Sequence, residues 1–65
     1  MHYVDLQHTD GTCEPIYQGE DYHEADRLYR LAIDNATEDV ANISWYHNII
    51  GHQEHIGTKI FRALE

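Results

Sequence analysis

Residues 21–36 read Asp-Tyr-His-Glu-Ala-Asp-Arg-Leu-Tyr-Arg-Leu-Ala-Ile-Asp-Asn-Ala and hold the most regular pattern in the chain. Asp21 followed by Glu24 is typical of a capping box, in which the first side chain accepts hydrogen bonds from amides of the first helical turn. This pattern predicts one amphipathic helix over residues 22–36. The apolar residues that recur at helical spacing are Tyr22, Ala25, Leu28, Tyr29, Ala32, Ile33 and Ala36.

Two strands are predicted before this helix. Residues 2–8 alternate between apolar and polar side chains, which is typical of a half-buried strand. The Asp-Gly pair in Thr9-Asp10-Gly11-Thr12 is a strong signal for a hairpin turn, so residues 13–18 are expected to form the return strand. Pro15 has no N–H group for a sheet hydrogen bond, which predicts an edge strand or a bulge.

Two further strands are predicted after the helix. Residues 40–50 are rich in β-branched and aromatic side chains, with Trp45 expected in the core. Gly51-His-Gln-Glu54 is expected to be a turn, and residues 55–63 alternate again. A helical turn within residues 55–64 is the alternative, because the apolar residues there also fit helical spacing.

The elements together predict an α+β fold made by one small domain of residues 1–65. We expect an antiparallel sheet of about four strands in the order β-β-α-β-β, with one amphipathic helix packed on one face. A single helix covers only one face of such a sheet. The open face is therefore a candidate partner or homodimer surface, with Tyr3, Tyr46 and Ile50 as candidate interface residues.

The charge balance restricts the classes of partner. Twelve Asp and Glu face four Lys and Arg in 65 residues, for a formal net charge of −8. Such a chain repels nucleic acid and anionic membranes and attracts basic protein surfaces, so no direct nucleic-acid or membrane binding is expected. Cys13 has no second cysteine for an internal disulfide, which favours the cytoplasm, or the cytoplasm of a host cell.

The acids gather near the two ends of the predicted helix. Glu14 belongs to the group expected around the helix start. The first group complements the helix dipole, whereas the dipole disfavours the acids near the helix end. One interpretation is simple solubility; the other is a binding face that imitates a phosphate backbone. The candidate partner-binding residues are Glu20, Asp21, Glu24, Asp26, Asp34, Glu38 and Asp39.

Histidines offer a weaker hypothesis of metal binding or pH response. His47, His52 and His55 lie close in sequence beside Glu54, and imidazole with carboxylate can bind zinc. No zinc motif accompanies them, so polar turn residues are the alternative and no metal or other cofactor is expected. The remaining histidines are expected in solvent: His2, His8 and His23.

No catalytic motif is found in the sequence, and an enzyme is not expected. The chain has no glycine-rich phosphate loop. Cys13 lies between Asp10 and Glu14, whose negative charges disfavour a reactive thiolate. The carboxylates Asp21 and Glu24 are explained by helix capping, so they do not require a role in acid–base chemistry.

One segment resembles a known protein class. Glu14-Pro-Ile-Tyr17, followed by His23-Glu-Ala25 at a helix start, is similar to the small phage inhibitors of bacterial RNA polymerase. The resemblance covers roughly residues 14–32 and implies a small inhibitor directed at a host protein. The basic strand contacts of that family are not evident in this sequence, where Lys59 and Arg62 are the only candidates, so the resemblance implies no functional residues. Small size and acidity are also similar to anti-CRISPR and anti-restriction proteins that imitate DNA.

The sequence therefore favours a non-enzymatic, acidic protein-binding module. The leading hypothesis is a phage or mobile-element inhibitor that occupies the basic surface of a host nucleic-acid-binding protein. Two alternatives stay open at this point. One is a structural homodimer that uses the open sheet face, and the other is a histidine-based metal-binding or pH-responsive protein.

Overall fold

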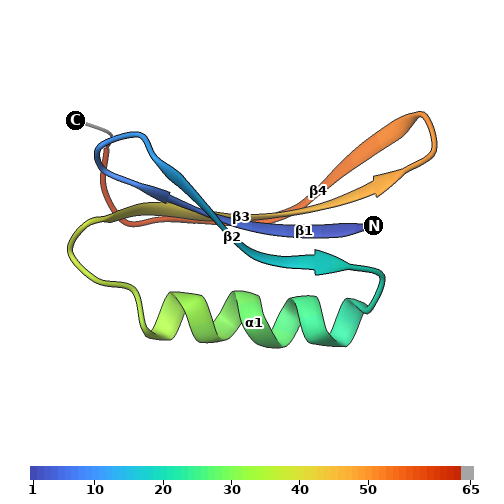
Figure 1. The fold of residues 1–65 in the computed structure, drawn as a ribbon, viewed down its shortest axis with the longest axis horizontal. Coiled ribbons are helices and arrows are strands. Elements are labelled where there is room, and N and C mark those ends of the chain that lie inside the picture. Colours follow the sequence, from blue (N-terminus) through green and yellow to red (C-terminus); the bar gives the residue numbers. More distant parts are fainter. Residues whose placement is uncertain (64–65) are drawn as a thin grey trace.

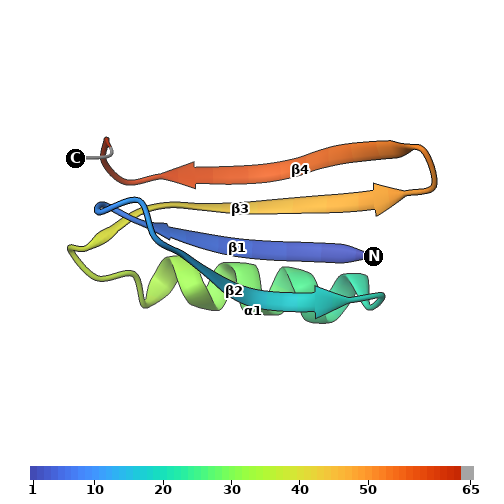
Figure 2. The ribbon, with the colours of Figure 1, turned by 45° about the horizontal axis from the view of Figure 1, so that its top comes forward.

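The computed structural model describes residues 1–63 and confirms the predicted α+β fold. Four antiparallel strands form one sheet in the order β2-β1-β3-β4, and the helix lies along one face of it (Figures 1 and 2). The elements are β1 (His2–His8), β2 (Cys13–Gly19), α1 (Tyr22–Asp34), β3 (Val40–Ile49) and β4 (His52–Ile60).

The core forms between the helix and the two central strands. Val4 of β1 lies opposite Trp45 of β3, and Leu6 lies opposite Ile43. Residues that face each other on neighbouring strands point to the same side of the sheet, so these four side chains meet α1 together. The buried apolar residues are Val4, Leu6, Ala25, Val40, Ala41, Ile43 and Trp45.

The helix packs on β1, β2 and β3. Ala25 is its buried residue, and Tyr29 and Ile33 pack half-buried against the core. The helix ends at Asp34, so the prediction of a helix to residue 36 was two residues too long. There the backbone amide and side-chain amide of Asn35 both donate to the Leu31 carbonyl, each at 3.0 Å, which closes the last turn.

The hairpin between β3 and β4 is tighter than expected. Ile49 lies opposite His52, so only Ile50 and Gly51 connect the strands, and the predicted turn over residues 51–54 was wrong. Gly51 supplies the positive φ of 74° that this short connection requires. The helical alternative for the last element was also wrong as far as Ile60, where β4 ends; residue 64 lies outside the described residues.

Bulges shift the register of both outer strands. On β2, Val4 faces Tyr17 whereas Asp5 faces Pro15, which confirms the predicted irregularity at Pro15 and its edge position. On β4, Trp45 faces Gly57 and Tyr46 faces His55. One residue of β4 therefore has no opposite partner on β3, and side chains beyond it change face.

Candidate protein-binding surface

The structure separates the candidate acidic residues into two groups. The group near the helix start lies where β2 leads into α1, and the other lies where α1 leads into β3, at the opposite end of the molecule in Figure 1. The thirteen residues of α1 separate the groups by roughly 20 Å. The seven candidate residues thus do not form one continuous patch.

Acids of the first group have local structural partners. The Asp21 carboxylate accepts hydrogen bonds from the amides of His23 and Glu24, at 3.0 and 3.2 Å, which confirms Asp21 as the N-cap. Glu24 does not reach back to complete the capping box; its carboxylate pairs with Arg27. The remaining pairs are Asp26 with Arg30 at 3.0 Å and Glu20 with the Met1 amino group at 3.3 Å.

Asp21 should contribute to stability through its cap rather than its charge. We expect Asp21→Ala to lower the free energy of unfolding by about 1 kcal/mol, because two amides of the first helical turn lose their acceptor. Asp21→Asn keeps an acceptor oxygen and is the matched control. Urea unfolding followed by circular dichroism measures both variants; equal losses in the two would contradict the capping role.

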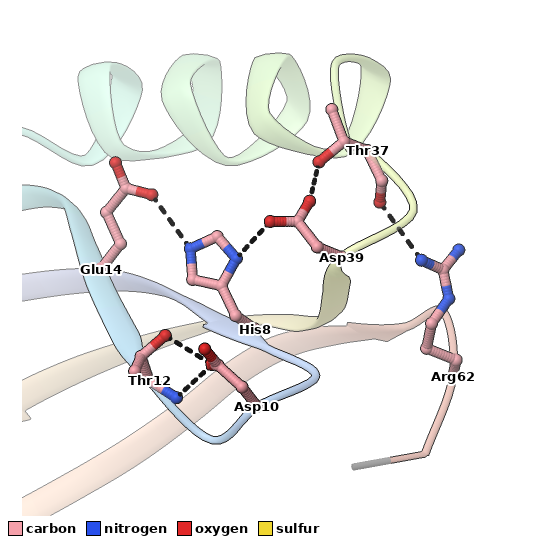
Figure 3. Close-up of polar contacts among 7 residues, drawn as sticks. All are labelled: His8, Asp10, Thr12, Glu14, Thr37, Asp39 and Arg62. Carbon is pink, nitrogen blue, oxygen red and sulfur yellow. Dashed lines mark hydrogen bonds and ion pairs between the residues drawn. The ribbon is translucent and has the colours of Figure 1, made fainter. Parts of the chain in front are cut away.

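The acidic group at the helix end has more members than the sequence predicted. Glu14 was expected near the helix start, but it lies near the start of β2, at the end of the molecule where the helix ends. His8 joins it to Asp39: Nε2 of His8 lies 3.4 Å from Glu14 Oε2, and Nδ1 lies 3.1 Å from Asp39 Oδ2 (Figure 3). Protonated His8 can donate to both carboxylates, whereas the neutral ring can donate to one.

Strand direction explains this meeting of distant segments. β1 and β3 are antiparallel, so the end of β1 lies beside the start of β3, and the Thr9 amide donates to the Asp39 carbonyl at 2.8 Å. The β1–β2 turn carries Asp10, and the α1–β3 connection carries Glu38. We define the acidic end as Asp10, Glu14, Asp34, Glu38 and Asp39, all of which are exposed.

Hydrogen bonds lower the pKa of two carboxylates of the acidic end. The Thr37 hydroxyl donates to Asp39 and, with a smaller effect of His8, lowers the pKa of that carboxyl. The hydroxyl and the amide of Thr12 donate to Asp10 at 2.7 and 2.9 Å and lower its pKa in the same way. These carboxylates therefore stay negative to lower pH than an ordinary aspartate.

Basic side chains neutralise the acidic end only slightly. Arg62 reaches it, but its Nη1 donates to the backbone carbonyl of Thr37 at 3.3 Å rather than to a carboxylate (Figure 3). Arg27 and Arg30 are paired on the helix. Within residues 1–63, no ion pair forms at three acids of this end, which are Asp10, Asp34 and Glu38.

The open face of the sheet carries two of the three candidate interface residues. Tyr3 and Tyr46 lie opposite each other on β1 and β3, half-buried on the side away from α1, and Tyr46 lies 5.1 Å from the His55 ring. Ile50 is fully exposed in the β3–β4 turn instead of on the strand. Homodimer formation through this face stays a prediction.

The histidine candidates for a metal site do not converge. His55 faces Tyr46 on the open side, whereas His47 lies on the helix side and His52 begins β4 beside the turn. Over residues 1–63 there is no group of three or more His, Cys, Asp or Glu side chains that could hold a metal ion. The histidine that sequence reasoning misjudged most is His2, which is buried with 4% exposure.

His2 is part of an aromatic cluster at the helix start. Its ring stacks on His47 with a centroid distance of 4.0 Å, and its Nδ1 accepts a hydrogen bond from Trp45 Nε1 at 3.1 Å. That hydrogen bond requires an unprotonated Nδ1. Burial, followed by His47 and the amino terminus, lowers the pKa of His2, so the neutral ring is the form that the fold accommodates.

The described part of the chain offers no concave site for a small ligand. No pocket is found in the surface of residues 1–63, and Cys13 is exposed on edge strand β2. No helix in this part of the chain has the length and apolar character needed to cross a membrane. Comparisons with protein-family models, curated proteins and solved structures found no match to this chain.

Proposed function

We propose that the protein is a non-enzymatic binding module that docks its acidic end on a basic surface of a protein partner. The supporting observation is the convergence of five exposed carboxylates from three separate segments: the β1–β2 hairpin, the end of α1 and the α1–β3 connection. Two of them accept hydrogen bonds from threonine hydroxyls, which lower their pKa. A preformed negative surface of this kind steers encounter with a positive one.

The net charge also restricts the identity of the partner. A net charge of −8 disfavours direct contact with nucleic acid, but it suits the basic surfaces of proteins that bind nucleic acid. We propose that this chain inhibits such a host protein by covering its phosphate-binding surface, in the cytoplasm of the cell. The support is the charge and the likeness of residues 14–32 to small phage inhibitors.

Asp34 and Glu38 provide the sharpest test, because neither is used in an ion pair among the described residues. We expect Asp34→Asn/Glu38→Gln to weaken partner binding tenfold or more, since each close charge pair contributes about 1 kcal/mol or more at such interfaces. Fold stability should be unchanged or slightly higher, because Asp34 lies at the negative end of the helix dipole.

The experiment compares capture of lysate proteins at low and high salt, with affinities then measured for the captured protein. Asp5→Asn/Glu20→Gln is the matched control, because it removes the same charge from exposed positions outside the acidic end. Salt should release the partner, since exposed charges are screened over about 10 Å at roughly 0.1 M salt. Equal losses in both double variants, or a partner that ignores salt, would contradict the proposal.

A further inference from the structure

The two edges of the sheet differ in their capacity to pair with another strand. A sheet edge presents unpaired backbone N–H and C=O groups, which proteins usually protect. β2 is protected by Pro15, which has no N–H group to donate. β4 has nine residues without proline, is exposed over most of its length, and lies outside the strands on which α1 mainly packs.

The bulge in β4 brings two opposite charges to one face. Glu54 and Lys59 are five positions apart, so a regular strand would place them on opposite faces. In this register Glu54 lies opposite His47 and Lys59 lies opposite Ile43. Those two β3 residues are four positions apart and share the helix side, so Glu54 and Lys59 share it as well.

This arrangement makes the β4 edge complementary to itself. Glu54 and Lys59 lie at equal distances from the Ile56–Gly57 peptide bond. If a second β4 runs antiparallel about a two-fold axis at that bond, Glu54 of each copy faces Lys59 of the other. On the open face, the same register places His55 opposite Thr58 of the second copy, so side chains match in orientation on both faces.

We propose that the protein forms a homodimer in which β4 pairs antiparallel with β4 of a second copy, giving one continuous eight-stranded sheet. The charge distribution favours a second copy as the occupant. β4 carries one acid and one Lys in a chain of net charge −8, so the strand itself is close to neutral. The antiparallel arrangement also keeps the two acidic ends at opposite extremes of the dimer, which limits their repulsion.

Two variants that reverse the charge of Glu54 or of Lys59 test the proposed register. Sedimentation from about 1 μM to about 1 mM covers weak interfaces, and the wild type should show a monomer–dimer equilibrium in this range. Glu54→Lys and Lys59→Glu should each weaken dimerisation about tenfold or more, because like charges then face each other twice. An equimolar mixture of the two variants should recover the dimer, because the lysine introduced at position 54 of one chain then faces the glutamate introduced at position 59 of the other.

Both positions are exposed, so the variants are expected to fold, and circular dichroism verifies this. Glu38→Lys makes the same charge change in the α1–β3 connection and should leave dimerisation unaffected. The proposal is overturned by a wild type that remains monomeric throughout the range, by a dimer that neither variant weakens, or by a mixture that stays monomeric. A dimer insensitive to these charges would instead agree with pairing through the open face.

Discussion

Replacement of Trp45 by Ala is expected to lower the free energy of unfolding by about 3–5 kcal/mol. Trp45 is 3% exposed, and its ring contacts Tyr29 and Tyr22 of the helix with centroid distances of 5.6 and 5.1 Å. Small domains have little stability to lose, about 5–15 kcal/mol for native proteins in general. The variant should therefore lose a large part of its stability and melt at a lower temperature, which thermal and urea unfolding followed by circular dichroism will measure.

Trp45→Phe separates packing from hydrogen bonding in this prediction. Phe keeps an aromatic ring against the helix but lacks the N–H group that donates to His2 Nδ1. The cost should be smaller, about 1–3 kcal/mol, for a buried acceptor left without its donor and a smaller ring. If Trp45→Ala cost less than about 1 kcal/mol, Trp45 would not be the central packing residue between sheet and helix.

Mild acid is expected to destabilise the protein through His2. Burial, the stacked His47 ring and the amino terminus lower the pKa of His2 from its ordinary value of 6.5, against a weaker opposite effect of Glu20 and Asp21. As the pH falls through 6.5, the unfolded chain binds a proton at His2 before the folded protein does. The stabilising contribution is therefore complete above pH 6.5 and is lost as the pH falls toward the lower folded pKa.

The structure also predicts how Trp45 fluorescence and two aspartates respond to acid. Protonation of Nδ1 removes the acceptor for the Trp45 N–H group, so Trp45 fluorescence should change along with stability. Asp10 and Asp39 also lose stabilising contributions in acid, but only below their ordinary pKa of 3.8, because their pKa values are lowered from there. Stability measured from about pH 8 to about pH 5 thus isolates the histidine effect.

His2→Asn is the control variant for the acid response. The Asn side-chain oxygen can accept from the Trp45 N–H group, and it does not titrate. We expect lower stability at neutral pH, because the stacking on His47 is lost, but a shallower decline toward pH 5. The other five histidines are present in both proteins. Equal slopes in both proteins would contradict the assignment to His2.

The fold could be predicted because its elements have distinct periodicities. The helical spacing of residues 22–36 and the alternation in residues 2–8 and 40–50 each agree with one kind of element. The ends of the strands were predicted less accurately where the composition of a segment is misleading. Ile50 is apolar and yet forms the turn, whereas the polar run from His52 belongs to β4, which exposes both faces near the turn.

The candidate surface was harder to predict, because it depends on contacts between distant segments. Glu14 lies close in sequence to the helix start, but β2 carries the chain along the whole sheet before the helix begins. His8 meets Asp39 only because β3 starts beside the end of β1. The sequence signal for the burial of His2 was limited to its position on the apolar side of β1. Its buried state depends on its contact with Trp45, which is distant in sequence.

The position of β1 in the middle of the sheet determines when the domain can be completed during synthesis. β1 is the first strand of the chain, but its inner neighbour β3 contains Trp45, 43 residues after His2. A nascent chain that has released only β1, β2 and α1 cannot bury Val4 and Leu6 against β3. Such long-range pairing slows folding, and this intermediate exposes a sheet edge and apolar side chains. We therefore expect the domain to complete its core only after β3 has emerged from the exit tunnel.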